Sequence, residues 1–324
     1  MYIRMQIEIS RNDKKDVTDA DWTHVEPVSN ILHSMFKRVD LEINFTSVIA
    51  TAQNYEYRAF FDAFCGFSEG AKNSFLKAAG GLTSSKKDLF VPKPPAPKDG
   101  KGRVVELMGI LHIDLALQHK ALLGQLQYKF QFTPHKPEFF LKVPDTNISP
   151  SVELLDAALS IHRAHVTAPI LEAHTIALSA APAKYPFTRS KVRTASLSNG
   201  IRDALIDNFV LGQLPRRAIL GLADNLEYNG VLHMNPYNFH HFNISHLACY
   251  LDGIQYPSRP YTPNFSEGSY IRQYLGLYQT LNQIAPDPAF ILTPEQYLKE
   301  CTLFIVNFAP DLSVVAASLA ISIL

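Results

Sequence analysis

The chain has 324 residues, of which 47% are hydrophobic, and its 30 basic and 30 acidic side chains give a formal net charge of zero. A chain of this length and apolar content can bury a large core, which excludes a wholly disordered protein and leaves room for about two domains. The neutral charge argues against a protein that coats nucleic acid, since such binding is driven by neutralising phosphates.

The first element is a strand. Apolar and polar side chains alternate over residues 3–9, which predicts a half-buried strand and not a secretory signal peptide. This strand leaves no room for a preceding loop. The apolar run at 312–324 is too short to span a bilayer. It indicates a buried strand, or a reading frame that ends inside the fold. We therefore expect both ends of the chain to be cut.

Further strands follow at intervals. Strict alternation over 39–45, 111–117 and 126–132 predicts antiparallel strands with one solvated face. Weaker strand signals occur at 152–166, 192–197, 218–222, 247–251 and 302–308.

Three helices interrupt the strands. Aromatic residues recur with helical spacing over 57–64 and again over 270–278, and an apolar run at 170–178 follows Pro169, a residue that favours a helix start. The proline- and lysine-rich run at 92–98 cannot join a sheet. It predicts an exposed excursion spanning 84–103.

The order of elements around the two aromatic helices matches. Each helix follows a strand, a polar turn, a loop that contains Asn, and a Tyr and Arg at the helix start. One unit used twice in an all-β chain with short helices is the plan of a double jelly roll, two antiparallel β-sandwiches in tandem. We expect the first jelly roll over 1–145 and the second over 146–324, with the C-terminal strands of the second missing.

Catalytic motifs are scarce. The sequence has no P-loop, dinucleotide-binding fingerprint, nucleophile elbow or HExxH motif, which lowers the expectation of an enzyme. The three cysteines, at 65, 249 and 301, are too widely spaced for a disulfide framework or a CxxC zinc site. They indicate a reducing compartment and thiols that act as small buried hydrophobic groups.

The histidines give the best case for a metal site. His233, His240, His241 and His246 are close in sequence, but no carboxylate stands at a short regular spacing among them. We favour a polar, aromatic-rich loop at the rim of a sandwich. Two alternatives stay open: a cupin-like, metal-dependent β-sandwich enzyme that uses His240 and His246, and a secreted carbohydrate-binding sandwich.

Motifs spread along the chain resemble one family. They are LHSMF (32–36), VD (39–40), YRA (57–59), VELMGILHID (105–114), AKYP (183–186), LGQLPRR (211–217), NPYNFHHFN (235–243), LDG (251–253), PSRP (257–260) and PDL (310–312). The chain resembles the hexon-like, double jelly-roll major capsid proteins of Polinton (Maverick) elements and adintoviruses, which are integrated in animal genomes. The resemblance covers nearly the whole sequence.

This resemblance implies a structural capsid subunit that is not an enzyme and has no cofactor or metal. The implied partner is the chain itself, in a homotrimer that forms a pseudo-hexameric capsomer, with a minor (penton) capsid protein as a further candidate. It implies no specific nucleic acid and no membrane span. The alternative within the same element is the minor capsid protein. The implied location is the virion, or otherwise the cytoplasm or nucleus, without secretion.

The residues expected to contact other subunits come from two of these motifs and from the starts of the two aromatic helices. They are Arg58, Gly212, Gln213, Leu214, Pro215, Arg216, Asn235, Pro236, Phe239, His240 and Arg272. The family carries further sequence before Tyr2 and after Leu312. We therefore expect a degraded copy in a host genome, with unpaired strand edges that favour aggregation.

Overall fold

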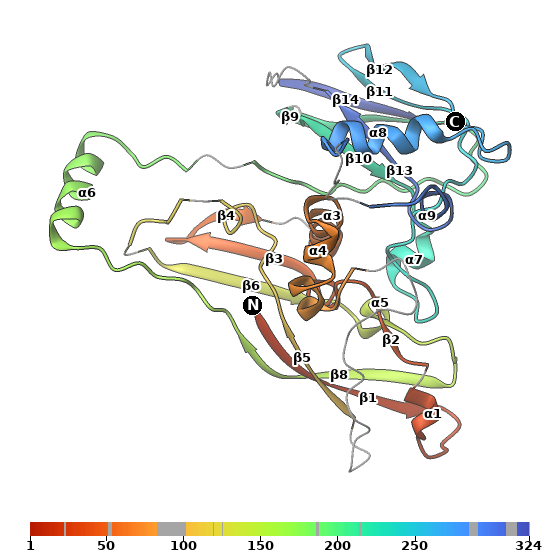
Figure 1. The fold of residues 1–324 in the computed structure, drawn as a ribbon, viewed down its shortest axis with the longest axis horizontal. Helices are drawn as coiled ribbons and strands as arrows, with labels where there is room; N and C mark the ends of the chain where they lie inside the picture. Colours follow the sequence, from red (N-terminus) through yellow and green to blue (C-terminus); the bar gives the residue numbers. More distant parts are fainter. Residues whose placement is uncertain are drawn as a thin grey trace.

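The computed structural model is mostly β-structure with short helices (Figure 1). It describes residues 1–22, 24–50, 54–82, 102–118, 120–124, 126–185, 188–213, 215–284, 291–308 and 316–323. The predicted excursion at 84–103 falls almost wholly outside these residues, as do the PDL motif and Leu214.

The strands before residue 159 form one set of antiparallel sheets, called here the N-terminal sheets. Their orders are β5-β1-β8, β4-β3-β6 and β2-β7. The bounds are β1 (Tyr2–Arg11), β2 (Glu26–Pro27), β3 (Phe36–Ile43), β4 (Thr46–Ala50), β5 (Arg103–Met108), β6 (Tyr128–Pro134), β7 (Leu141–Lys142) and β8 (Ile148–Ala158). The short helices among them are α1 (Asp19–Trp22), α2 (Ile31–Ser34), α3 (Tyr55–Gly66), α4 (Glu69–Lys72), the 3-10 helix η1 (Phe75–Ala79) and α5 (Pro137–Phe140).

The strands after residue 203 form a second antiparallel set, the C-terminal sheets. Their orders are β12-β11-β14-β9 and β10-β13. The bounds are β9 (Ala204–Gln213), β10 (Arg217–Gly221), β11 (Leu247–Leu251), β12 (Ile254–Tyr261), β13 (Leu303–Asn307) and β14 (Ala316–Ile323). The helices are α7 (Asn225–Asn229), α8 (Ile271–Leu281) and α9 (Pro294–Lys299), while α6 (Ala168–Ala180) lies between the two sets. Within the described residues, no strand of one set pairs with a strand of the other.

The alternation in the sequence explains which faces are buried. In β1, Ile3, Met5 and Ile7 are buried, whereas Arg4 and Glu8 are exposed, as predicted. The strands predicted around 39–45 and 126–132 are β3 and β6, which pair along their length. The predicted strands at 218–222, 247–251 and 302–308 are β10, β11 and β13, and the apolar C-terminal run contributes β14. One connected cluster of buried side chains extends through both sets of sheets.

The strand predicted at 111–117 is wrong. The backbone turns there instead, because the N–H of Ile113 binds the carbonyl of Leu111 and the N–H of Ala116 binds that of Ile113. Leu111, Ile113 and Leu115 are nevertheless buried. The alternation therefore reports burial in an irregular segment, and the strand of this region is β5, which ends just before it. The segment 192–197 is also not a strand, and β8 ends at Ala158.

The three predicted helices are present as α3, α6 and α8. Helix α6 stands apart from both sets of sheets, at the left of Figure 1, and no residue in it is buried. Among the helices that the structure describes, none has the length and apolar character to cross a bilayer.

Candidate assembly interface

An aromatic cluster joins the N-terminal sheets to the C-terminal sheets, and it contains Phe239, one of the predicted interface residues. Helix α3 supplies Phe60, whose ring stacks on Tyr237 with centroids 4.4 Å apart and planes 9° apart. Phe61 of the same helix packs on Phe239 at 5.4 Å. We call the following set the aromatic junction: Tyr57, Phe60, Phe61, Phe139, Tyr228, Tyr237 and Phe239.

Hydrogen bonds fix the hydroxyl groups of this junction. The Tyr237 hydroxyl lies 2.5 Å from Ser34 Oγ, and the Tyr57 hydroxyl donates to the carbonyl of Pro236 at 3.2 Å. Burial raises the pKa of the Tyr57 and Tyr237 hydroxyls well above their usual range, so both stay protonated. A buried tyrosine ring stabilises the fold by packing, and the hydrogen bond of its hydroxyl group fixes the orientation of the ring. The junction therefore holds the two sets of sheets in one orientation.

The NPYNFHHFN motif forms this junction from the C-terminal side. The Asn235 carboxamide oxygen accepts the N–H of Tyr237 at 3.2 Å, and Pro236 and Phe239 are buried. His240 Nε2 lies 2.7 Å from Glu227 Oε2. The structure thus brings Asn235, Pro236 and Phe239 together with helix α3 inside one chain. Their role in contacts between subunits stays a prediction.

Arg58 lies on α3 with its guanidinium buried. Its Nη2 is 2.5 Å from Asp114 Oδ1, its Nε is 3.4 Å from Asp62 Oδ2, and it also donates to the carbonyl of Ser190. Asp114 accepts the N–H of Ser190 at 3.2 Å as well. A buried charge needs such partners, because its desolvation is costly. Arg58 is therefore engaged inside the chain, where it ties α3 to the segment that leads into β9.

The remaining predicted interface residues lie on the C-terminal sheets. Gly212 and Gln213 end β9, where they pair with Ala317 and Ala316 of β14. Pro215 is half-buried and Arg216 is exposed, and Leu214 lies outside the described residues.

Arg272, at the start of α8, is exposed. Its guanidinium donates to the carbonyls of Pro260 at 2.6 Å and Arg259 at 2.5 Å, and it lies over the Tyr261 ring. Arg216 and Arg272 are exposed residues of the described chain, and the His240 side chain is 37% exposed.

The histidines have separate surroundings. His240 pairs with Glu227, and the ring of His241 stacks on Phe265 at 4.4 Å. Burial, followed by the charge of His240, lowers the pKa of His241. Among the residues that the structure describes, no group of three or more His, Cys, Asp or Glu side chains is placed to hold a metal ion.

The cysteines lie inside the fold with free thiols. Burial raises the pKa of Cys65 and of Cys249 to about 12, and that of Cys301 further. At neutral pH these thiols are protonated and therefore poor nucleophiles.

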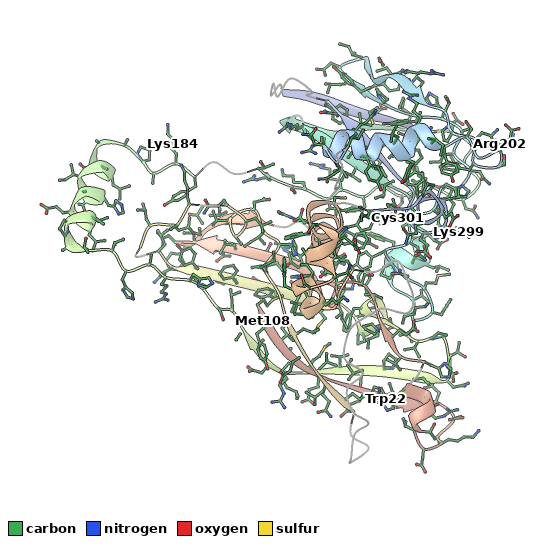
Figure 2. The ribbon with its side chains drawn as sticks, viewed as in Figure 1. Trp22, Met108, Lys184, Arg202, Lys299 and Cys301 are labelled. Carbon is green, nitrogen blue, oxygen red and sulfur yellow. The ribbon has the colours of Figure 1, made fainter. Side chains whose placement is uncertain are left out.

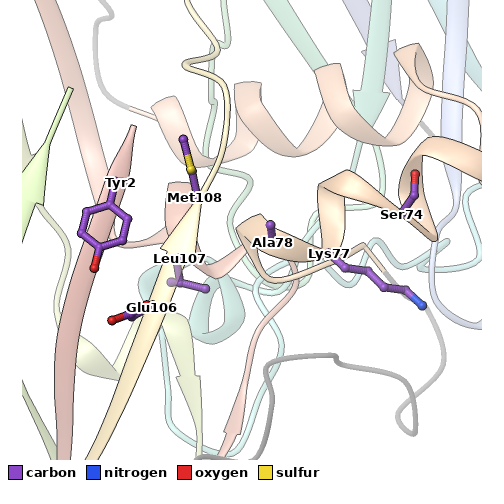
Figure 3. Close-up of a pocket in the computed structure, with 7 residues that line it drawn as sticks. All are labelled: Tyr2, Ser74, Lys77, Ala78, Glu106, Leu107 and Met108. Carbon is purple, nitrogen blue, oxygen red and sulfur yellow. The ribbon is translucent and has the colours of Figure 1, made fainter. Parts of the chain in front are cut away.

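A pocket of about 580 Å³ lies beside the end of β5, and no pattern in the sequence predicted it (Figure 3). Tyr2 of β1 and Glu106, Leu107 and Met108 of β5 line it on one side, and Ser74, Lys77 and Ala78 line it on the other. Asp62 and Asp114, the partners of Arg58, were also missed. The sequence does contain a signal for Asp62, which stands four residues after Arg58 on the same helix, whereas Asp114 is distant in the sequence.

The chain was compared with known proteins. No family model matches it. It is similar to the uncharacterized protein F54H12.2 of Caenorhabditis elegans, with 26% identity over 265 residues, or 79% of this chain. The chain spans 61% of the length of that relative.

Two solved structures resemble the chain at low identity. The cryo-EM structure of the Sputnik virophage contains a chain that matches with a TM-score of 0.54 and 12% identity, over 99% of this chain and 74% of that one. The structure of PBCV-1 VP54 fitted into a reconstruction of Sputnik matches with a TM-score of 0.48 and 11% identity, over 100% and 76% of the two chains. The first of these shows that the chain shares its fold with a chain of the Sputnik virophage structure.

Proposed function

We propose that this chain is a structural capsid subunit of the double jelly-roll type, which acts by self-association and not by catalysis. The observation that carries the proposal is the division of the strands into two antiparallel sets that share no strand pairing in the described residues. The match to the Sputnik virophage chain over 99% of this sequence supports it.

The boundary between the two proposed sandwiches differs from the boundary that the sequence predicted. A division at 145/146 falls just before β8, which pairs with β1 from Tyr2 to Arg11. We therefore assign residues 1–158 to the first jelly roll and the strands from Ala204 onward to the second. Residues 159–203 connect them.

Helices α3 and α8 fit the idea of one unit used twice. Each is an aromatic-striped helix attached to its own set of sheets, and α8 packs against β13. Three chains with two similar units each give a six-lobed ring, the shape implied for a pseudo-hexameric capsomer.

The particular family we propose is the hexon-like major capsid protein of an integrated Polinton or adintovirus element. Support comes from the NPYNFHHFN and VELMGILHID motifs, whose residues make the aromatic junction and the Arg58–Asp114 pair. In this proposal the junction sets the angle between the two sandwiches of a subunit. Arg216 and Arg272 then contact the neighbouring subunit, since their side chains are exposed.

The test is the mass of the purified 36.3 kDa chain in solution, measured by size-exclusion chromatography with light scattering across a range of concentrations. We expect a trimer, and an Arg216→Glu variant that dissociates more readily. Arg202→Glu is the matched control, because Arg202 is equally exposed but was not among the predicted contacts. A wild-type chain that stays monomeric at every concentration would overturn the proposal.

A further inference from the structure

The segment that connects the two sets of sheets carries an unbalanced positive charge. From residue 173 to residue 202 the sequence has five Lys or Arg residues and no Asp or Glu, although the chain as a whole is neutral. Four of the five fall within residues 184–193, called here the basic connector. They are Lys184, Arg189, Lys191 and Arg193, and all four are exposed.

The body of the chain holds the backbone of the basic connector in place. The N–H of Ser190 donates to Asp114 Oδ1 at 3.2 Å, and the carbonyl of Ser190 accepts from the Arg58 guanidinium. Val192 is half-buried and packs against the core. The basic side chains on either side of these two residues therefore stand at fixed places on the surface. A preorganised surface loses less entropy when a partner binds.

An opposite surplus of charge lies on the solvent face of the sheet β5-β1-β8. Strand pairing places Arg4 opposite Glu106 of β5 and Asp156 of β8, and Glu153 pairs with the next outward-facing residue of β1. Residues that pair directly across strands share a face, and Glu8 joins them by alternation along β1. We call Glu8, Glu106, Glu153 and Asp156 the acidic face, and all four are exposed.

The acidic face keeps its surplus when its basic neighbours are counted. Arg4 is the one basic residue on this side of the three strands, and its Nε lies 3.6 Å from Glu106. Lys77 lines the pocket beside the same Glu106. Glu8, Glu153 and Asp156 make no ion pair with another residue that the structure describes. Three carboxylates therefore remain without a cation.

The two charged surfaces of one chain lie apart. In Figure 1 the sheet β4-β3-β6 lies between the sheet β5-β1-β8 and the connector that returns from α6 toward β9. Figure 2 shows Lys184 well away from Met108, which follows Glu106 by two residues on β5. The acidic face is therefore available to the basic connector of another copy and not to that of its own chain.

We propose that the basic connector of one copy contacts the acidic face of a second copy of this chain. Oppositely charged surfaces steer two proteins together, and like charges exclude the wrong orientation. Because the two surfaces are different parts of the chain, the contact is head to tail, and such contacts form a ring when the rotation closes. The inference rests on the proposed function and names a contact by which its subunits associate.

A nucleic acid is the less suitable occupant of the basic connector. Proteins that bind nucleic acid by charge usually present a broad positive surface, whereas this chain has a net charge of zero. The acidic face would repel phosphate groups, but it supplies the matching charge for a second copy.

The first experiment reverses the charges of each surface in turn. Lys191→Glu/Arg193→Glu and Glu153→Lys/Asp156→Lys are each expected to raise the concentration at which the oligomer dissociates by about tenfold or more, because attraction becomes repulsion. The quadruple variant with all four substitutions again pairs opposite charges, so we expect it to associate nearly as well as the wild type. Added NaCl should weaken the wild-type oligomer, since salt screens exposed charges.

The matched control is Arg202→Glu/Lys299→Glu, which changes the net charge as much as the reversal in the basic connector. Both residues are exposed, and Figure 2 shows them on the opposite side of the molecule from Lys184. We expect this control to associate like the wild type. Circular dichroism and the urea unfolding midpoint establish that each variant is folded.

The second experiment identifies the partners. Unlabelled and heavy-nitrogen-labelled chains are mixed, allowed to exchange, and treated with a carbodiimide, which joins a Lys amine to a neighbouring carboxylate as an amide with net loss of water. Mass spectrometry is expected to find Lys191 joined to Glu153 or Asp156 in peptides that combine one labelled and one unlabelled chain.

The outcomes separate this inference from the proposed function. A wild-type trimer that both double variants leave intact, with no mixed cross-link, overturns the contact and leaves the capsid assignment standing. A quadruple variant that stays as weak as the double variants also overturns the pairing of these two surfaces. A monomeric wild type overturns both proposals. Binding of duplex DNA by the wild type, but not by Lys191→Glu/Arg193→Glu, would assign the basic connector to nucleic acid and overturn the contact between copies.

Discussion

The buried guanidinium of Arg58 provides the sharpest test of the structure. Its side chain is 6% exposed and that of Asp114 is 3% exposed, and the two groups are 2.5 Å apart. Replacing Arg58 with Met keeps most of the volume but leaves the Asp114 carboxylate buried without its cation. Removing one partner of a buried pair costs about 3–5 kcal/mol of unfolding free energy. We expect Arg58→Met to lose that amount.

The double variant Arg58→Met/Asp114→Leu distinguishes a broken pair from lost packing. Replacing both charges with apolar groups removes the unpaired carboxylate, so we expect much of the lost free energy to return, with a coupling of about 2 kcal/mol or more between the two sites. Arg4→Met is the control, because the pair of Arg4 and Glu106 is solvent-exposed and should contribute less than about 1 kcal/mol.

The assay is urea unfolding followed by the fluorescence of Trp22, the single tryptophan, which is buried among the N-terminal sheets. An Arg58→Met variant that unfolds within about 1 kcal/mol of the wild type would show that the Asp114 carboxylate does not depend on this cation. If that variant kept its stability but lost self-association, Arg58 would contact a neighbouring subunit, as the sequence alone predicted.

Three further outcomes concern single residues. Burial holds the pKa of His33 well below 6.5, so below that pH the unfolded chain takes up a proton that the folded chain does not. The unfolding free energy should therefore fall as the pH drops below 6.5, by about 1.4 kcal/mol per pH unit. Unfolding curves measured over a pH series would show this slope, and a folded His33→Asn variant should lack this part of it. Phe60→Ala, which removes a stacked ring of the aromatic junction, should cost about 3–5 kcal/mol in urea unfolding, whereas Phe45→Ala, at a ring that is 90% exposed, should cost almost nothing; equal effects would contradict the packing described. Gly221→Ala would place a Cβ 2.6 Å from a ring carbon and should lower the unfolding free energy by about 1–3 kcal/mol, while Gly66→Ala, with open space at that position, should be neutral or stabilising.

Elements with one buried face and one solvent-exposed face were predicted from the sequence. Strand β1 and helices α3 and α8 carry clear periodicity because one side of each meets the core. Residues 111–117 alternate in the same way, but their burial comes from turns that direct Leu111, Ile113 and Leu115 inward. Alternation shows which side chains are buried, and it does not show whether a neighbouring strand provides hydrogen bonds.

The candidate site was harder to predict. The motif that contains Asn235 and Phe239 was predicted to contact other subunits, and the structure places it against α3 of the same chain. Sequence spacing cannot separate contacts within a chain from contacts between chains. Helix α6 illustrates the converse, because its apolar run predicted a helix but gave no hint that the helix would be uncovered.

A strand from each end of the described chain lies inside a sheet, between two neighbours. β1 lies between β5 and β8, and β14 lies between β11 and β9. During synthesis, β1 therefore cannot complete its pairing with β8 until Ala158 has left the ribosome. In the same way, β9 cannot pair with β14 until Ile323 has been made. A prematurely released product would lack the strand that joins β9 to β11. Incomplete polypeptides would then be recognisable to chaperones and proteases by their open sheet.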